Sequence, residues 1–533
     1  MRNKKNDTLI IFIFMIIISI SLVLGCLKHF TSIPFDVELK GYIDVTDDIE
    51  LSADSILDRS FMNYFESKID TYLPLRGIYI KTYNTLMYYL FNVGNRPIGK
   101  DGYIFEPAYL ESTCCMGVHD YSSETKNKEM QDFVDQLVEV NNKLNAIGKS
   151  FFVYVVPGKS TILPEKMPLK YRLMYKEKSL NSTESLKEMI QKANLPCVFC
   201  EDYVDSLEYP PFYSSGIHWS RTYEQFTSKS LVNEIGELTK KHYKNFSTDS
   251  VAISTEPFRR DADVYNLLNL WPQPECTYYQ YNTSAPVGGG YDRLNMLLYG
   301  DSFSEGLYND LYENIPEDNI ARINRDEYVA NSTGSFYDLN HDWTNLNLQF
   351  HLDCADVIAV EIVEPCIVDY TNGYLKYLSD YLDTYVPKPI NSYYLDCFDA
   401  NDPAPLTDYC GKGFYGKEQG FSWVKPYASL TINEKSVSAA GIEISYTVPQ
   451  QIFDFAKEDI VDIYINSKLY CQKKYEAQTT ETLVISREML GEPVNGGYNI
   501  EIRASEYFNP AEKKMSDDGR DLAIQCLYLG GVR

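Results

Sequence analysis

Residues 296–308 read MLLYGDSFSEGLY, and they carry the main indication of the fold class. The apolar run Met296–Tyr299 predicts a short buried strand, Gly300 permits a sharp turn, and the residues after it predict a helix. Ser302 would then lie in the first turn of that helix, where free backbone N–H groups can stabilise an oxyanion. The same residues also fit a simple helix cap, because Asp301 and Ser302 are both of types favoured at helix N-termini.

Further buried runs alternate with amphipathic stretches on both sides of this segment. Ser150–Val156 (SFFVYVV) and Asp356–Val363 (DVIAVEIV) predict strands, and Met130–Ile147 and Thr222–Leu238 predict helices. Strands that alternate with helices in this way predict an α/β layered domain with a mainly parallel sheet, which we place at 61–390. Ligands bind such sheets beyond the carboxyl ends of the strands, so the active edge is expected there.

The pattern changes in the C-terminal part of the chain. Residues 391–415 are rich in Pro, Asp and Gly and predict a linker. Residues 416–533 contain short alternating runs, such as GIEISYTV and YNIEIRA, with turns between them. This spacing predicts a β-sandwich, which we expect to resemble a jelly roll.

The N-terminus contains an uncharged apolar stretch at 8–27, about the length that spans a bilayer as a helix. Basic residues precede it, so the positive-inside rule places residues 1–7 in the cytoplasm and the rest of the chain outside. We expect an uncleaved single-pass anchor followed by a stalk at 28–60. A cleaved signal peptide, or a lipoprotein lipidated at Cys26, remains an alternative.

Composition narrows the classes of function. Hydrophobic residues make up 44% and charged residues 23%, which is typical of a globular chain. A formal net charge of -26 opposes binding to nucleic acid. The 45 tyrosines suit a carbohydrate surface. The 12 cysteines include the pair Cys197 and Cys200, but without a second such pair the sequence predicts no zinc site.

A serine nucleophile needs a general base. The chain has 6 histidines, and His218 has the most suggestive setting, in YSSGIHWS just before a predicted helix. A His-Trp pair can equally pack within a loop.

Taken in order, these segments resemble the alginate O-acetyltransferase AlgX/AlgJ-like family, a group of DHHW-type bacterial envelope proteins with a permuted SGNH-hydrolase-like domain. The resemblance covers roughly residues 60–370, and the order of the motifs makes it specific. The matching segments are Phe65–Arg76 (FESKIDTYLPLR), Ile98–Phe105 (IGKDGYIF), Val155–Glu165 (VVPGKSTILPE), His218-Trp219, Gly300–Ser304 and Val360–Glu364 (VEIVE).

The resemblance implies that Ser302 accepts an acetyl group, that His218 acts as the base, and that a carboxylate two residues before the histidine orients it. This chain has Gly216 at that position. Either another acid replaces it, or the site works as a slower dyad, or the protein is a catalytically degenerate member. The nearby candidates for the acid are Asp202, Asp205 and Glu208.

Other family positions imply supporting roles. Asp301, Tyr308, Lys159 and Glu364 are expected around the site, although Lys159 and Glu364 could equally form a structural salt bridge. The segment Asp518–Leu522 resembles the closing strand of jelly-roll modules on glycan-modifying proteins. It implies either glycan binding or a structural lid.

The resemblance therefore implies an extracytoplasmic O-acetyltransferase that acts on a cell-surface or exported polysaccharide. It implies an acetyl donor relayed by a multi-spanning membrane O-acyltransferase, with no cofactor and no metal. A serine esterase that removes acetyl groups would use the same residues. A glycan-binding scaffold of an export complex is the alternative without catalysis, and Gly216 supports it.

Overall fold

The computed structural model describes most of the chain after residue 37. The described ranges are 37–41, 50–72, 75–120, 123–175, 182–271, 275–286, 290–331, 336–364, 373–404 and 409–533, with 371 and 406 and the early positions 11, 12, 15, 16, 19 and 23. Most of the predicted anchor at 8–27, and Cys26, lie outside these residues. Within the described part of the chain, no helix is both long enough and apolar enough to cross a membrane.

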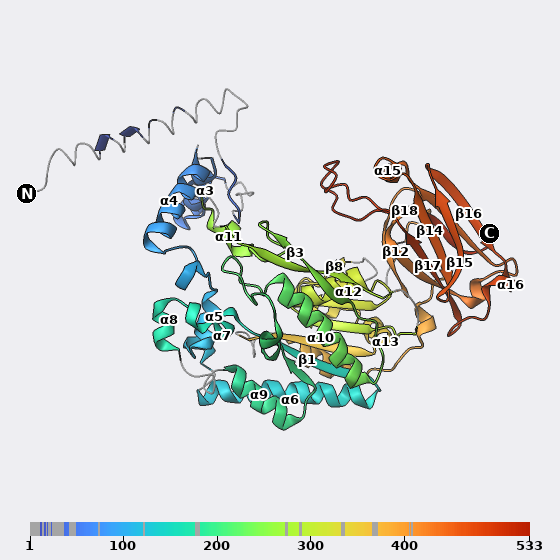
Figure 1. The fold of residues 1–533 in the computed structure, drawn as a ribbon, viewed down its shortest axis with the longest axis horizontal. Coiled ribbons are helices and arrows are strands. Elements are labelled where there is room, and N and C mark those ends of the chain that lie inside the picture. The colour runs from blue at the N-terminus through green and yellow to red at the C-terminus, as the bar shows by residue number, and fades with distance from the viewer. Residues whose placement is uncertain are drawn as a thin grey trace, which may run out of the picture.

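A seven-stranded sheet forms the centre of the molecule, in the order β2-β1-β9-β5-β6-β7-β8 (Figure 1). The first five strands run parallel, and β7 and β8 add an antiparallel edge. The mainly parallel α/β sheet predicted from the sequence is thereby confirmed. The strands are β1 (Ser150–Val156), β2 (Cys197–Phe199), β5 (Asn295–Gly300), β6 (Asn319–Asn324), β7 (Tyr328–Asn331), β8 (Phe336–Asp338) and β9 (Val357–Val363).

Helices pack on this sheet through one continuous apolar core. Helix α6 packs on β1, α9 and α14, whereas α10 packs on α12. Ser123 caps α6 by accepting a hydrogen bond from the Lys126 N–H, so the helix begins before the apolar run that predicted it. These helices are α6 (Glu124–Ala146), α9 (Ser182–Ala193), α10 (Arg221–Thr239), α12 (Ser304–Asn314), α13 (Leu348–Cys354) and α14 (Tyr374–Leu382).

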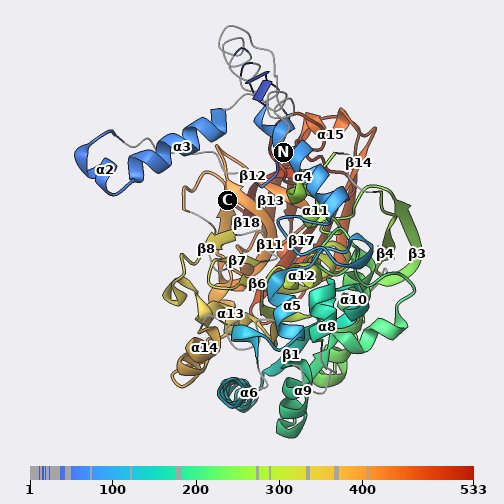
Figure 2. The ribbon, with the colours of Figure 1, turned by 90° about the vertical axis from the view of Figure 1, so that its left-hand side faces the viewer.

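Smaller elements surround the strand ends. The helices α2 and α3 project from the body of the molecule, and α2 lies within the stretch expected to be a stalk (Figure 2). A second apolar cluster packs residues of α4 and α11 with Ile98 and Ile104, and so fixes α11. The elements are α2 (Ala53–Leu57), α3 (Ser60–Tyr72), α4 (Arg76–Phe91), α5 (Pro107–Thr113), α7 (Lys159–Ile162), α8 (Leu169–Met174), α11 (Asp263–Leu268), β3 (Ser247–Ser254) and β4 (Tyr278–Ser284).

The C-terminal domain is a nine-stranded antiparallel sheet wrapped around its own apolar core. Its main path runs β15-β14-β17-β12-β18-β13-β16, and β10 pairs with β18 and β11 with β12. The strands are β10 (Cys397–Asp399), β11 (Gly411–Lys417), β12 (Ser422–Asn433), β13 (Ile442–Val448), β14 (Asp459–Ile465), β15 (Lys468–Tyr475), β16 (Thr479–Ile485), β17 (Gly497–Ala504) and β18 (Ile524–Gly531), with the short helices α15 (Gln450–Phe453) and α16 (Arg487–Leu490).

Two expectations for this domain need correction. A β-sandwich with two separate sheets was expected. The strands instead form one continuous sheet, because β12 pairs with β17 along one part of its length and with β18 along another. The segment 391–415 is not simply a linker, because β10 and the start of β11 lie within it and belong to the sheet. Both strands are short, and the Gly- and Asp-rich sequence around them concealed their pairing.

The two domains lie side by side, with the antiparallel domain at the end of the molecule away from α3 and α4 (Figure 1). Polar contacts join them. The Lys412 ammonium donates a hydrogen bond to the Asp318 carbonyl at 2.5 Å, and Arg293 pairs with Glu501 at 2.6 Å. The Lys425 ammonium lies 4.2 Å from the centre of the Tyr312 ring.

Candidate active site

The turn between β5 and α12 presents Ser302 at the carboxyl edge of the parallel sheet. Gly300 is needed there, because a Cβ atom would lie 2.6 Å from the Ser304 Cβ and 2.7 Å from the Glu361 carboxylate. Asp301 shapes the turn: its N–H donates to Glu361 at 2.9 Å, and its carboxylate accepts the Phe303 N–H at 2.7 Å. Asp301 therefore holds the turn that carries Ser302.

Ser302, His218 and a third residue form a continuous line of hydrogen bonds. The Ser302 Oγ lies 2.7 Å from His218 Nε2, and His218 Nδ1 lies 2.6 Å from Asp263 Oδ2. The His218 ring packs against Phe303, with ring centres 4.5 Å apart. This arrangement suits nucleophilic catalysis, because a base contacts the hydroxyl and an acid orients the base.

The acid comes from an unexpected segment. Asp263 is the first residue of α11, and its Oδ1 also accepts the Ile217 N–H at 3.0 Å. The prediction that the acid is one of three carboxylates before His218 is therefore wrong. All three are exposed, and one of them forms an ion pair with Lys187 at 2.8 Å. The three are Asp202, which makes that pair, Asp205 and Glu208.

Gly216 leaves the space that Asp263 occupies. A Cβ atom on Gly216 would lie 3.0 Å from Asp263 Oδ1 and 2.9 Å from the Asp261 carbonyl oxygen. The position that carries the acid in the family motif thus faces a carboxylate brought by another segment. The sequence contained no local signal for this pairing, because Asp263 follows His218 by 45 residues.

Lys159 holds the loop that carries His218. Its buried ammonium donates hydrogen bonds to the carbonyl oxygens of Ile104 (3.0 Å), Tyr213 (2.6 Å) and Gly216. Burial lowers the pKa of Lys159 to about 7. Lys159 therefore acts as a positioning residue, and the described structure shows no salt bridge between it and Glu364.

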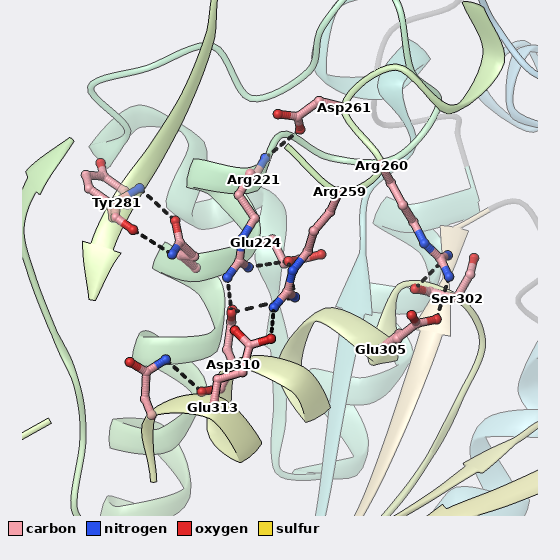
Figure 3. Close-up of polar contacts among 12 residues, drawn as sticks. Arg221, Glu224, Arg259, Arg260, Asp261, Tyr281, Ser302, Glu305, Asp310 and Glu313 are labelled. Atoms are coloured by element: carbon pink, nitrogen blue, oxygen red, sulfur yellow. Dashed lines mark hydrogen bonds and ion pairs between the residues drawn. The ribbon is translucent and has the colours of Figure 1, made fainter. Parts of the chain in front are cut away.

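Arg260 places a cationic group beside the nucleophile (Figure 3). Its Nη1 lies 3.2 Å from the Ser302 carbonyl oxygen and 3.3 Å from His218 Nε2, and its Nη2 pairs with Glu305. The Ser302 backbone N–H makes no hydrogen bond within the described residues. A free N–H and a guanidinium near Ser302 can both stabilise a developing oxyanion. The sequence analysis did not identify Arg260.

The loop before α11 is fixed by ion pairs between α10 and α12 (Figure 3). Arg221 pairs with Glu224 and lies 2.5 Å from Asp310, and both acids are buried. Arg259 pairs with Glu313 at 2.6 Å and with Glu224 at 3.3 Å. The neighbouring Arg260 and Asp263 are held in place by this network.

Two other predicted site residues, Tyr308 and Glu364, make no hydrogen bond or ion pair with Ser302, His218 or Asp263 within the described residues. Tyr308 packs on the core and stacks on Tyr312, with ring centres 6.1 Å apart. Glu364 is buried, accepts the Gly158 N–H at 2.6 Å and a hydrogen bond from the Thr183 hydroxyl, and has a pKa raised to about 7 by burial. Glu364 joins the ends of β1 and β9, so its contacts are structural.

In the described part of the chain, His, Cys, Asp and Glu side chains form no group of three or more that could hold a metal ion.

Comparisons with known proteins give remote structural matches. No protein-family model matches the sequence, and the search of curated proteins found no match. The O-acetyltransferase domain of Pseudomonas putida AlgJ aligns at 14% identity with a TM-score of 0.35, over 54% of this chain and 99% of that domain. Pseudomonas aeruginosa AlgX aligns at 11% identity with a TM-score of 0.36, over 82% of this chain and 92% of its own.

A third match is Bacillus cereus PatB1 with a sulfonyl adduct, at 10% identity and a TM-score of 0.34, over 52% of this chain and 97% of its own. At these identities and scores the matches describe likeness of fold only. The chain is thus structurally similar, at low identity, to AlgJ, AlgX and PatB1.

Proposed function

We propose that this protein is an O-acetyltransferase that moves an acetyl group, through an acetyl-Ser302 intermediate, onto a hydroxyl of a cell-surface or exported polysaccharide. The observation that carries the proposal is the hydrogen-bonded line from Ser302 through His218 to Asp263. This line supports acyl transfer, and the order of the sequence motifs supports acetyl as the group and a glycan as the acceptor.

In the first half-reaction, the Ser302 Oγ attacks the carbonyl carbon of an acetyl donor while His218 Nε2 takes its proton. Asp263 stabilises the imidazolium through Nδ1. The Ser302 N–H and the Arg260 guanidinium stabilise the oxyanion of the tetrahedral intermediate. The intermediate collapses when His218 returns the proton to the leaving group, which leaves the acetyl ester on Ser302.

In the second half-reaction, His218 Nε2 takes the proton of the acceptor hydroxyl, whose oxygen attacks the acetyl carbonyl. The new ester forms as the Ser302–acetyl bond breaks, and His218 returns the proton to Ser302. Water in place of the sugar hydroxyl would make the same site an esterase. The contact between His218 and Asp263 favours catalysis over the scaffold alternative, because it offers an acid in place of the one missing at Gly216.

We also propose that the folded part of the chain lies outside the cytoplasm. The apolar stretch 8–27 supports a membrane tether, either as an anchor helix or through lipidation at Cys26. Acetyl-CoA is cytoplasmic, so an enzyme on the outer side would receive acetyl groups from a multi-spanning membrane O-acyltransferase.

Acetylation of Ser302 tests the proposal directly. The full chain, in detergent, is incubated with p-nitrophenyl acetate, with and without oligosaccharides, and both protein and sugar are analysed by mass spectrometry. We expect acetyl on Ser302 and then on the sugar, with loss of both in Ser302→Ala and retention in Ser206→Ala, a control at an exposed serine. Equal behaviour of Ser302→Ala and the wild type would refute a catalytic role, and free acetate without acetylated sugar would identify an esterase.

A further inference from the structure

A cavity of about 620 Å³ lies between the two domains. Its α/β side includes Asn295 and Asn319, the first residues of β5 and β6, whereas Ser302 follows the last residue of β5. A strand advances about 3.3 Å per residue, so the cavity and Ser302 lie on opposite edges of the sheet, roughly 20 Å apart. The cavity is therefore separate from the candidate active site.

Three charged side chains in the lining of the cavity already have partners within the protein. Arg293 pairs with Glu501 at 2.6 Å, and Asp356 pairs with Lys241 at 2.9 Å. Asp353 accepts hydrogen bonds from two tyrosine hydroxyls, at 2.5 and 2.6 Å. Each of these charged groups therefore already has an ion-pair or hydrogen-bond partner within the protein, which favours an uncharged ligand.

The lining is rich in amides and hydroxyls that retain hydrogen-bonding capacity. The Asn499 Oδ1 is buried and has no hydrogen-bond partner among the described residues. The side chains of Ser467 and Asn495 and the Tyr394 hydroxyl make no hydrogen bonds within the same residues. An amide carries both a donor and an acceptor, so this set matches a ligand with many hydroxyl groups.

Several of these groups lie on turns of the C-terminal domain. Asn466, Ser467 and Asn495 lie in tight turns of the C-terminal domain, with φ of 47°, 66° and 51°. The Asn466 Oδ1 accepts the Asn499 N–H at 2.9 Å and joins one turn to β17. Aromatic rings of Tyr394 and Tyr409 complete the wall with apolar faces.

We propose that this cavity, whose walls come from both domains, binds a short uncharged saccharide. Amides and hydroxyls would pair with sugar hydroxyls, and the tyrosine rings would cover the apolar faces of the sugar rings. The site would hold a glycan away from Ser302, so its existence does not depend on catalysis there.

The full chain is tested in a detergent that has no sugar head group. The probes are maltotriose, cellotriose and tri-N-acetylchitotriose, with trigalacturonic acid as the charged counterpart, and binding is measured by calorimetry and saturation-transfer NMR. The pocket variant is Tyr394→Phe with Asn495→Gly, which removes a hydroxyl and an amide but keeps the ring and tolerates the positive φ. Its matched control is Tyr507→Phe with Asn340→Gly, at an exposed tyrosine and an exposed asparagine with φ of 53°.

We expect at least one uncharged trisaccharide to bind, and the pocket variant to bind it roughly tenfold more weakly because two hydrogen bonds are lost. The control variant and Ser302→Ala should bind as the wild type does. The inference fails if none of the uncharged probes binds, if only trigalacturonic acid binds, or if pocket and control variants bind equally. If the protein binds the sugar but Ser302 is never acetylated, the proposed function is refuted and the saccharide site is not.

Discussion

Asp263 gives the candidate site its acid from a segment that follows the histidine by 45 residues. The same carboxylate accepts the Ile217 N–H, so it holds both the backbone and the ring of the histidine segment. Gly216 makes room for it, since a side chain there would meet the Asp261 carbonyl. The absence of a side chain at Gly216 and the presence of Asp263 are therefore linked, because the carboxylate occupies space that a side chain would fill.

Replacing this acid should reduce catalysis without unfolding the protein. In Asp263→Asn, the amide no longer stabilises an imidazolium, and we expect acetylation of Ser302 to slow by roughly 1,000-fold or more. Release of p-nitrophenol from p-nitrophenyl acetate measures the rate. Asp205→Asn, at an exposed carboxylate, is the matched control and should react as the wild type does. A rate for Asp263→Asn within a few-fold of the wild type would remove Asp263 from the mechanism.

Adding a side chain at Gly216 should be harmful, even when it restores the acid of the family motif. In Gly216→Ala, the Cβ would lie 2.9 Å from a backbone carbonyl, and we expect the free energy of unfolding to fall by about 1–3 kcal/mol. Gly216→Asp should also lose activity, because two carboxylates would compete for one place.

Urea unfolding measures the stability of Gly216→Ala. The rate of p-nitrophenyl acetate cleavage measures the activity of Gly216→Asp. Gly416→Ala is the control, because no atom lies within 4 Å of its added Cβ. An Asp at 216 that raised the rate would contradict this account of the site.

Ser302 and His218, which the structure places in contact, could be proposed from the sequence because each lies in a local pattern. Ser302 follows an apolar run and a glycine, and His218 precedes a capped helix. Asp263 and Arg260 have no such pattern. Their roles come from the packing of α11 against a cluster that includes Ile98 and Ile104, and contacts between distant segments leave no periodic signal.

Among the elements, continuous apolar runs gave the most accurate predictions. Ser150–Val156 was predicted and observed with the same bounds, because a strand buried on both faces consists almost entirely of apolar residues. The short strand β10 and the Gly-rich β11 were missed. Their places depend on the register of β18 and β12, which a single segment does not encode.

Glu364 should make the junction between β1 and β9 sensitive to pH. Its pKa is raised by burial from 4.5 to about 7, so folding favours its protonated form. Relative to Glu364→Gln, the wild type should be most stable below pH 4.5 and should lose roughly 3 kcal/mol as the pH rises to about 7.

Urea unfolding of both proteins between pH 4 and 8 measures this difference. Glu237→Gln, at an exposed glutamate of α10, is the matched control. A constant difference for Glu364→Gln would show that the carboxyl is not protonated in the folded protein.

At the scale of the whole molecule, the two domains share buried polar contacts rather than a loose connection. Lys412 is buried, and its ammonium reaches the Asp318 carbonyl across the interface. We expect Lys412→Met to leave that carbonyl without its donor and to cost about 1–3 kcal/mol. The single calorimetric unfolding transition expected of the wild type should then separate into two.

Differential scanning calorimetry makes this comparison, with Lys468→Met as the control at an exposed lysine of β15. Unfolding of Lys412→Met in one transition at the wild-type temperature would mean that the domains are coupled by other contacts.

The pairing of Gly216 with Asp263 also bears on how genomes are searched for active enzymes. A survey that requires an acid two residues before the histidine would reject this chain, which has Gly216 there. The triad here is complete in three dimensions and incomplete only as a linear motif. A glycine at the motif position is therefore a reason to look for an acid elsewhere in the fold before a chain is set aside as inactive.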